Sequence, residues 1–93
     1  DKIVSTRNYL LQQNYPNPFN PTTTIEFTLP QSGFVTLKVY NILGQEVATL
    51  LQAHKPAGSY AVNFDASELT SSIYYYTLTA DGFKQSRKMV LLH

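Results

Sequence analysis

Residues 72–92 read SIYYYTLTADGFKQSRKMVLL, two runs of strand-forming residues separated by Asp81 and Gly82. Aspartate and glycine tolerate the positive φ angles that a tight two-residue turn requires. The first run alternates between two faces, as a half-buried strand does. The residues that we expect to face the core are Tyr74, Tyr76 and Leu78. The stretch therefore predicts an antiparallel β-hairpin.

The same two-residue period recurs along most of the chain, and no stretch shows a helical period longer than one or two turns. The predicted strands cover residues 9–13, 24–29, 35–39, 46–52, 60–64, 72–80 and 83–92. The alternation breaks within residues 46–52, which predicts a β-bulge there. Glycines and prolines separate the runs at intervals typical of sandwiches. The predicted fold class is all-β, a seven-stranded antiparallel immunoglobulin-like β-sandwich.

Residues 14–21, NYPNPFNP, form the most unusual stretch of the chain. Its three prolines lack amide donors and disfavour helical angles in the residues before them, which excludes a helix or a central strand. We expect a stiff connector whose asparagines satisfy nearby amides through local turns. Tyr15 and Phe19 are both expected to reach a core.

Composition narrows the functional classes. The chain has 93 residues, 43% of them hydrophobic and 14% charged, which suits one small globular domain. A net charge of +1 provides no field that would attract nucleic acid or an anionic membrane. The longest apolar run, residues 89–92, is too short to span a bilayer. No cysteine is available for a disulfide.

Catalytic chemistry is sparse. Histidine occurs only at positions 54 and 93, so neither a catalytic triad nor a multi-histidine metal site can be assembled. Asp65 and Glu68 could form an acid/base pair or ligate calcium, but capping of a turn is the more economical interpretation. The glycines are dispersed, so no phosphate-binding loop is present. We expect no enzyme activity, no metal and no cofactor.

The last predicted strand is basic, with Lys84, Arg87 and Lys88 following the final acidic residue. One interpretation is protective, because lysines on a sheet edge discourage aggregation. The other is functional, because an edge strand can pair with a strand of a partner. Exchange of this strand between copies would give a strand-swapped homodimer.

Four segments resemble, in order, the type A C-terminal sorting domain of the bacterial type IX (Por) secretion system. They are LLQQNYPNPFNPTTTIEFTLP (10–30), GFVTLKVYNILGQEVATL (33–50), AGSYAVNFDASELTSSIYYYTL (57–78) and KMVLL (88–92). The family usually has a glycine where this chain has Ser72, which questions a glycine-dependent turn at that point.

The resemblance implies a secretion signal at the end of a larger exported protein of Bacteroidetes, in transit through the periplasm to the outer membrane, the cell surface or the medium. Its implied partners are the type IX translocon, an outer-membrane shuttle component and a sortase-like peptidase that often removes the domain. Recognition is attributed to the last strand and to the turn near residue 44. The residues concerned are Lys84, Arg87, Lys88, Met89, Val90, Leu91, Gly44, Gln45, Glu46 and Val47.

The resemblance also divides the chain into a linker to upstream cargo, residues 1–8, and the sorting domain, residues 9–93. The absence of an initiator methionine and of a signal-peptide pattern favours a fragment of a longer protein. The alternative is a permanent immunoglobulin-like accessory module, either similar to flagellar hook-capping domains or carbohydrate-binding. The latter would need an exposed aromatic patch, for which Phe34, Tyr40 and Tyr75 are the candidates, although single exposed aromatic residues are common on sandwiches.

Overall fold

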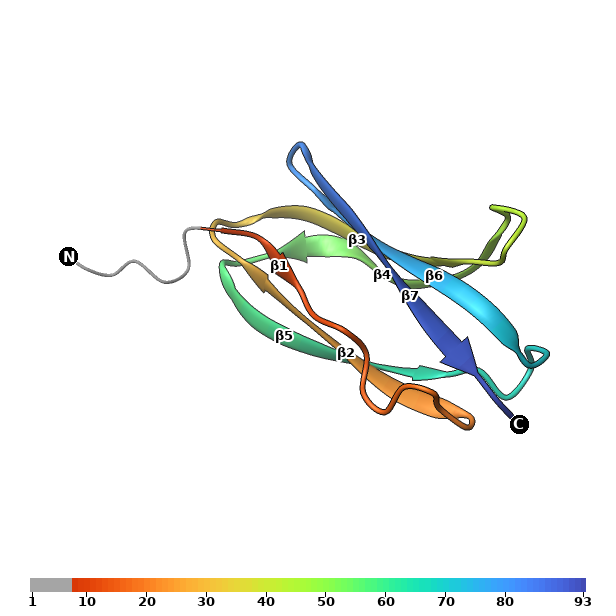
Figure 1. Ribbon diagram of the computed structural model, residues 1–93. Coiled ribbons are helices and arrows are strands. Elements are labelled where there is room, and N and C mark those ends of the chain that lie inside the picture. Colours follow the sequence, from red (N-terminus) through yellow and green to blue (C-terminus); the bar gives the residue numbers. More distant parts are fainter. Residues whose placement is uncertain (1–7) are drawn as a thin grey trace.

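A computed structural model describes residues 8–93. Two sheets pack face to face, a three-stranded sheet in the order β1-β2-β5 and a four-stranded sheet in the order β4-β3-β6-β7 (Figure 1). The strands are β1 (Leu10–Leu11), β2 (Thr22–Leu29), β3 (Gly33–Tyr40), β4 (Glu46–Lys55), β5 (Gly58–Asp65), β6 (Ser72–Ala80) and β7 (Phe83–Leu91). The predicted seven-stranded antiparallel sandwich is confirmed. Over residues 8–93 no helix could cross a membrane.

The core lies between the sheets and is filled by alternate residues of the strands. In β6, Tyr74, Tyr76 and Leu78 are buried, as predicted, while Ile73 and Tyr75 face outward. The other fully buried side chains of largest volume are Phe27, Leu11, Ile25, Leu29, Leu37, Met89, Leu91, Val35 and Val39. The two-residue period therefore identified the buried face of each central strand.

The predicted irregularity in β4 is present. The pairing of β3 with β4 shifts once between Leu37 and Lys38 and again between Val39 and Tyr40. β4 also continues to Lys55, beyond the predicted end at residue 52. An extra residue in one strand of a pair bends that strand and raises its local twist.

The hairpin that joins β6 to β7 has the predicted turn. Asp81 has a φ of 48° and Gly82 a φ of 87°, which are the left-handed angles of a two-residue turn. Among residues 8–93, Asp81 is the only residue other than glycine with a positive φ. Ser72 therefore does not adopt a backbone conformation that requires glycine, and β6 begins at this residue.

The segment between β1 and β2, residues 12–21, is called the connector below. Phe19 is 2% exposed and its ring lies 6.2 Å from that of Phe64, so its predicted burial is confirmed. Tyr15 is 81% exposed, so the same prediction for Tyr15 was wrong. Tyr15 pairs with Thr24 of β2, and opposed residues of an antiparallel pair share a face of the sheet. Because Thr24 faces outward, Tyr15 does too.

A buried polar cluster fixes the start of the connector. Asn14 is 2% exposed, and its backbone amide donates to the hydroxyl of Tyr76 at 2.8 Å. That hydroxyl in turn donates to the carbonyl of Gln12 at 2.6 Å. The Asn14 amide group donates to Thr23 Oγ1 at 3.0 Å and to the carbonyl of Pro16 at 3.1 Å. Regular pairing with β2 therefore ends soon after Leu11, because the chain turns inward toward Tyr76. As a result, β1 is shorter than predicted.

Candidate recognition surface

β7 is an outer strand of the four-stranded sheet, and the connector covers part of its outer edge. The Phe19 amide donates to the Val90 carbonyl at 2.9 Å, and the Leu92 amide donates to the Phe19 carbonyl at 3.0 Å. The Val90 amide donates to Asn17 Oδ1 at 2.9 Å, and Gln13 Nε2 donates to the Lys88 carbonyl. The connector therefore occupies the edge of β7 from the Lys88 carbonyl to Leu92.

The other half of this edge is open. Along an extended strand, the backbone groups of alternate residues point to the same side. Since those of Val90 and Leu92 point away from β6, those of Lys84 and Ser86 do as well. Within residues 8–93 these groups have no hydrogen-bond partner. We call this stretch, residues 84–88 up to the amide of Lys88, the open half of β7.

The predicted recognition residues of β7 divide into three groups. Met89 and Leu91 are fully buried in the core, and the polar backbone groups of Val90 are engaged by the connector. Lys84 and Lys88 are exposed and project from the outer face of the sheet. Arg87 is half-buried, and its Nε donates to the Leu11 carbonyl at 2.6 Å, which joins the two sheets at this side of the sandwich.

The predicted turn near residue 44 is rigidly built. Asn41 Oδ1 accepts hydrogen bonds from the amides of Leu43 at 2.9 Å and Gln45 at 3.0 Å, and Gly44 adopts a φ of 82°. The tip of this turn carries Ile42 and Leu43, which are 63% and 77% exposed. Sequence reasoning missed both, although two large aliphatic residues within a turn are a detectable signal.

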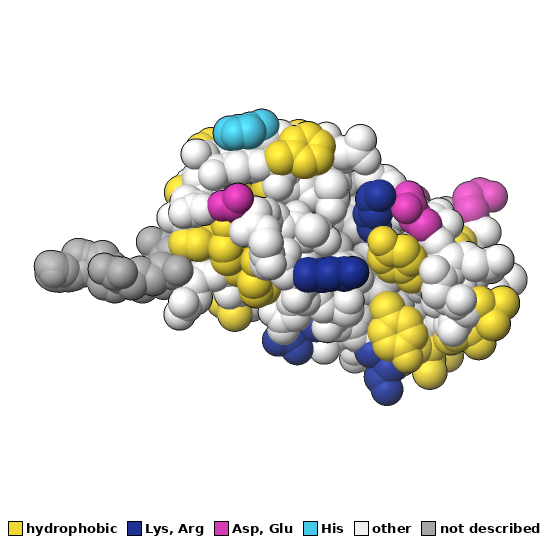
Figure 2. All heavy atoms as spheres, turned by 90° about the horizontal axis from the view of Figure 1, so that it is seen from above, with side chains coloured by type: hydrophobic (Ala, Val, Ile, Leu, Met, Phe, Trp, Pro, Cys, Tyr) yellow, Lys and Arg dark blue, Asp and Glu magenta, His cyan; other side chains and the backbone are white. Residues whose placement is uncertain are grey.

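A single cross-strand row connects the turn with β7. Glu46 of β4 is paired with Tyr40 of β3, Tyr40 with Tyr75 of β6, and Tyr75 with Lys88 of β7. Figure 2, a view onto the four-stranded sheet, shows hydrophobic side chains interspersed with cations and acids on this side. The two segments implied in recognition therefore lie at the same end of one sheet face.

The acidic end of that row is tied to a neighbouring cation. Lys38 Nζ lies 3.3 Å from Glu46 Oε1, and the Thr49 hydroxyl donates to Glu46 Oε2 at 2.8 Å. The Thr49 hydrogen bond, followed by Lys38, lowers the pKa of Glu46 below its ordinary value. Glu46 is thus held ionised and in a fixed position.

The candidate aromatic patch is only partly assembled. Tyr40 and Tyr75 are cross-strand neighbours, but Phe34 pairs with His54 at the other end of β3. The face consequently presents an aromatic pair and a separate phenylalanine.

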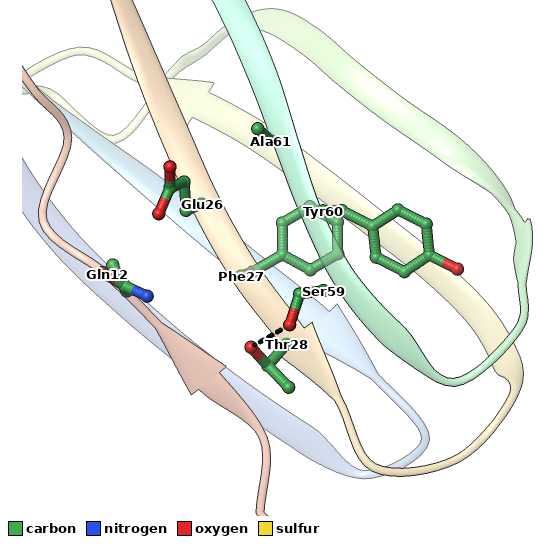
Figure 3. A pocket seen from close by; sticks show the side chains of 7 residues that line it. All are labelled: Gln12, Glu26, Phe27, Thr28, Ser59, Tyr60 and Ala61. Carbon is green, nitrogen blue, oxygen red and sulfur yellow. Dashed lines mark hydrogen bonds between the residues drawn. The ribbon is translucent and has the colours of Figure 1, made fainter. Parts of the chain in front are cut away.

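The outer face of the three-stranded sheet has a shallow hollow of about 300 Å³. Figure 3 shows its lining, in which Glu26 is the one carboxylate and the hydroxyls of Thr28 and Ser59 bond to each other. Asp65 lies elsewhere and caps a turn, as predicted, by accepting a hydrogen bond from the Ser67 amide at 2.9 Å. That bond lowers the pKa of Asp65. Over residues 8–93 no group of three or more potential metal ligands occurs.

Comparison with known families identifies this sandwich. The sequence model of the family described as "Secretion system C-terminal sorting domain" matches residues 13–92. The chain belongs to this family. As a sorting domain of the type IX system it directs attached cargo across the outer membrane, toward the cell surface or the medium, and it interacts with the secretion machinery.

A solved structure resembles the sorting domain in fold. Dimeric latent PorU from Porphyromonas gingivalis matches with a TM-score of 0.69 at 14% identity, over 97% of this chain and 10% of that one. The sorting domain thus spans about a tenth of the PorU chain. No curated protein matches its sequence.

Proposed function

We propose that the type IX translocon and its shuttle component recognise the sorting domain through the open half of β7. A strand of the partner would pair with the backbone groups of Lys84 and Ser86, and the exposed cations Lys84 and Lys88 would select an acidic segment. The observation that carries this proposal is the stretch of unoccupied edge between the 81–82 turn and the connector.

The outer face of the four-stranded sheet extends the proposed contact. The row from Glu46 to Lys88 would lie against the partner, and the tip formed by Ile42 and Leu43 would insert into an apolar pocket. Gly44, Gln45, Glu46 and Val47 would then act by shaping the turn that presents this tip. Met89 and Leu91 would act indirectly, by fixing β7 to the core.

The remaining assignments concern the route and the fate of the domain. We propose passage through the periplasm, with residues 1–8 as the linker to cargo and residues 9–93 as the sorting domain. Residues 1–7 lie outside the described part of the chain. A sortase-like peptidase would cleave in or before this linker. The domain itself would carry an address and perform no catalysis, which agrees with the single carboxylate in the hollow on the three-stranded sheet.

A reporter fusion tests the proposed function. Residues 1–93 are fused to a periplasmic reporter in a host that carries the type IX machinery, and the reporter is measured in the periplasm and the medium. Export of this fusion, together with periplasmic retention of a fusion that lacks residues 84–92, is the expected result. Retention of the intact fusion, in a host that exports its native cargo, would refute the proposal.

A further inference from the structure

The two sheets have four outer strands, and the edges of three of them are blocked at least in part against pairing with other chains. β1 has only two residues, β4 is distorted by two register shifts, and β7 carries cations and is partly covered by the connector. Short strands, bulges and lysines are the devices by which proteins block sheet edges. β5 has none of them. It pairs with β2 over eight residues without a shift and contains neither proline nor a basic residue.

The hydrogen bonds of β2 determine which residues of β5 have backbone groups that point to its outer edge. Thr24 and Glu26 accept hydrogen bonds from the connector side, at Tyr15 and Gln12. The backbone groups of the residues that alternate with Thr24 and Glu26 therefore form hydrogen bonds with β5. Their partners in β5 are Tyr60, Val62 and Phe64. The backbone groups that point to the outer edge then belong to Ser59, Ala61 and Asn63. Their side chains are small and cannot shield the edge.

The side of β5 that faces the other sheet carries apolar surface next to this edge. Tyr60 and Val62 pack against the core but are only partly buried. The Tyr60 ring stacks on Phe27 at 5.4 Å, and in Figure 3 it extends along the β5 side of that pair, away from Gln12. A neighbouring strand would cover both side chains. Burial of such apolar area is the main favourable contribution to association.

Opposite charges lie near the two ends of β5. Lys55 lies beside the start of the strand, with Nζ 5.4 Å from the centre of the Tyr60 ring. Asp65 is its last residue. An antiparallel copy of β5 would place the Lys55 end of each chain alongside the Asp65 end of the other, which gives a favourable arrangement of charge. A parallel copy would instead place like charges together.

We propose that the sorting domain forms a homodimer by antiparallel pairing of β5 with β5 of a second copy, about a two-fold axis at Ala61. In this register Ser59 is opposite Asn63 of the partner copy, and Tyr60 is opposite Val62. Every outward-pointing backbone group of these residues gains a partner, and the two three-stranded sheets become one continuous sheet. This pairing leaves the open half of β7 accessible. It is independent of the proposed recognition by the translocon.

Because Ala61 faces its own copy across the axis, the pairing can be tested by charge. Ala61 is exposed and is paired with Glu26 of β2 in its own chain. Ala61→Glu should therefore lower the free energy of unfolding by at most about 1 kcal/mol, and thermal denaturation of both Ala61→Lys and Ala61→Glu verifies that each variant is folded. Like charges directly opposite each other destabilise a strand pair, and opposite charges support it. Sedimentation velocity of residues 1–93 up to about 1 mM should give a dimer for the native chain. Each variant alone should dissociate with a constant at least about tenfold higher, which corresponds to roughly 1.4 kcal/mol.

The decisive sample is an equimolar mixture of the two variants. The mixture should dimerise at least as tightly as the native chain, whereas Lys84→Glu, on the β7 edge, should leave native dimerisation unchanged. A native chain that stays monomeric at about 1 mM would overturn the proposal, since the free energy of association would then be weaker than about −4 kcal/mol. A mixture that associates no better than its separate components would also overturn it, as would dimerisation that is lost in Lys84→Glu.

Discussion

The side chain of Asn17 accepts a hydrogen bond at 2.9 Å from the backbone amide of Val90, a residue 73 positions later in the chain. This bond gives the NYPNPFNP stretch a structural role, because groups of the connector form hydrogen bonds with the edge of β7 at its end. Prolines suit this role, since their rigidity fixes the position of the groups between them. The connector thereby limits the length of β7 that another strand can reach.

Replacement of Asn17 by alanine leaves the Val90 amide without its acceptor. We expect Asn17→Ala to lower the free energy of unfolding by about 1 kcal/mol, measured by urea denaturation. Amide exchange should accelerate at Val90. Asn20→Ala is the matched control, because Asn20 is exposed and should change stability by less than about 0.5 kcal/mol. Equal effects of the two substitutions would refute the assigned role of Asn17.

Tyr76 should make stability depend on alkaline pH. Burial raises the pKa of its hydroxyl above the ordinary value of 10.0, so the folded state favours the neutral phenol. This contribution is fully present below pH 10.0 and is lost as the pH rises through the raised pKa. Tyr76→Phe should weaken the alkaline loss of stability. At pH 7 it should cost about 1–3 kcal/mol, because the Asn14 amide and the Gln12 carbonyl lose their partner.

Tyr75→Phe provides the control for that measurement. Tyr75 is 39% exposed on the outer face, and its substitution should change stability by less than about 0.5 kcal/mol at pH 7. An alkaline transition that persists unchanged in Tyr76→Phe would contradict the assignment.

Proline substitution distinguishes the two sides of β7. The Lys84 amide points to the open edge, whereas the Gln85 amide points toward β6. Lys84→Pro should therefore cost less than about 1 kcal/mol, while Gln85→Pro removes a ladder bond and should cost about 3 kcal/mol or more. Thermal denaturation followed by circular dichroism measures both. If Lys84→Pro proves as damaging as Gln85→Pro, the open half of β7 has been placed on the wrong residues.

The tip of the 41–45 turn can be altered without disturbing the core. The double substitution Ile42→Ser and Leu43→Ser should leave stability within about 0.5 kcal/mol and reduce export of the reporter fusion severalfold. Phe34→Ser is the matched control, since Phe34 is 55% exposed at the opposite end of β3 and should not affect export. Unchanged export in the double variant would remove the tip from the recognition surface.

Local patterns in the sequence predicted the parts of the fold that local physics determines. The alternation around Ile25 and Leu37 identified the inner faces of β2 and β3, and Asp81 with Gly82 identified the last hairpin. The expected local role of Asn17 was incomplete, because its bond to Val90 depends on how distant strands meet. Tyr15 was misplaced for a related reason, since pairing with Thr24 decides which way it points.

The candidate surface was predictable only in part. Basic residues marked the last strand as an edge, and the family resemblance directed attention to Gly44 and its neighbours. The coverage of β7 by the connector could not be predicted from the sequence, because it depends on contacts between segments that are more than 70 residues apart, made by backbone groups and by the side chains of Gln13 and Asn17. The cross-strand row from Glu46 to Lys88 likewise depends on strand order, which alternation does not specify.

Charge reversal on the open half of β7 tests whether the secretion machinery recognises this strand. A reporter fusion that carries Lys84→Glu and Lys88→Glu is compared with one that carries Lys55→Glu, and the thermal stability of each purified domain is measured. We expect the β7 variant to stay folded and to lose export severalfold, whereas the Lys55 variant should be exported normally. Normal export of the folded β7 variant would contradict recognition through this strand.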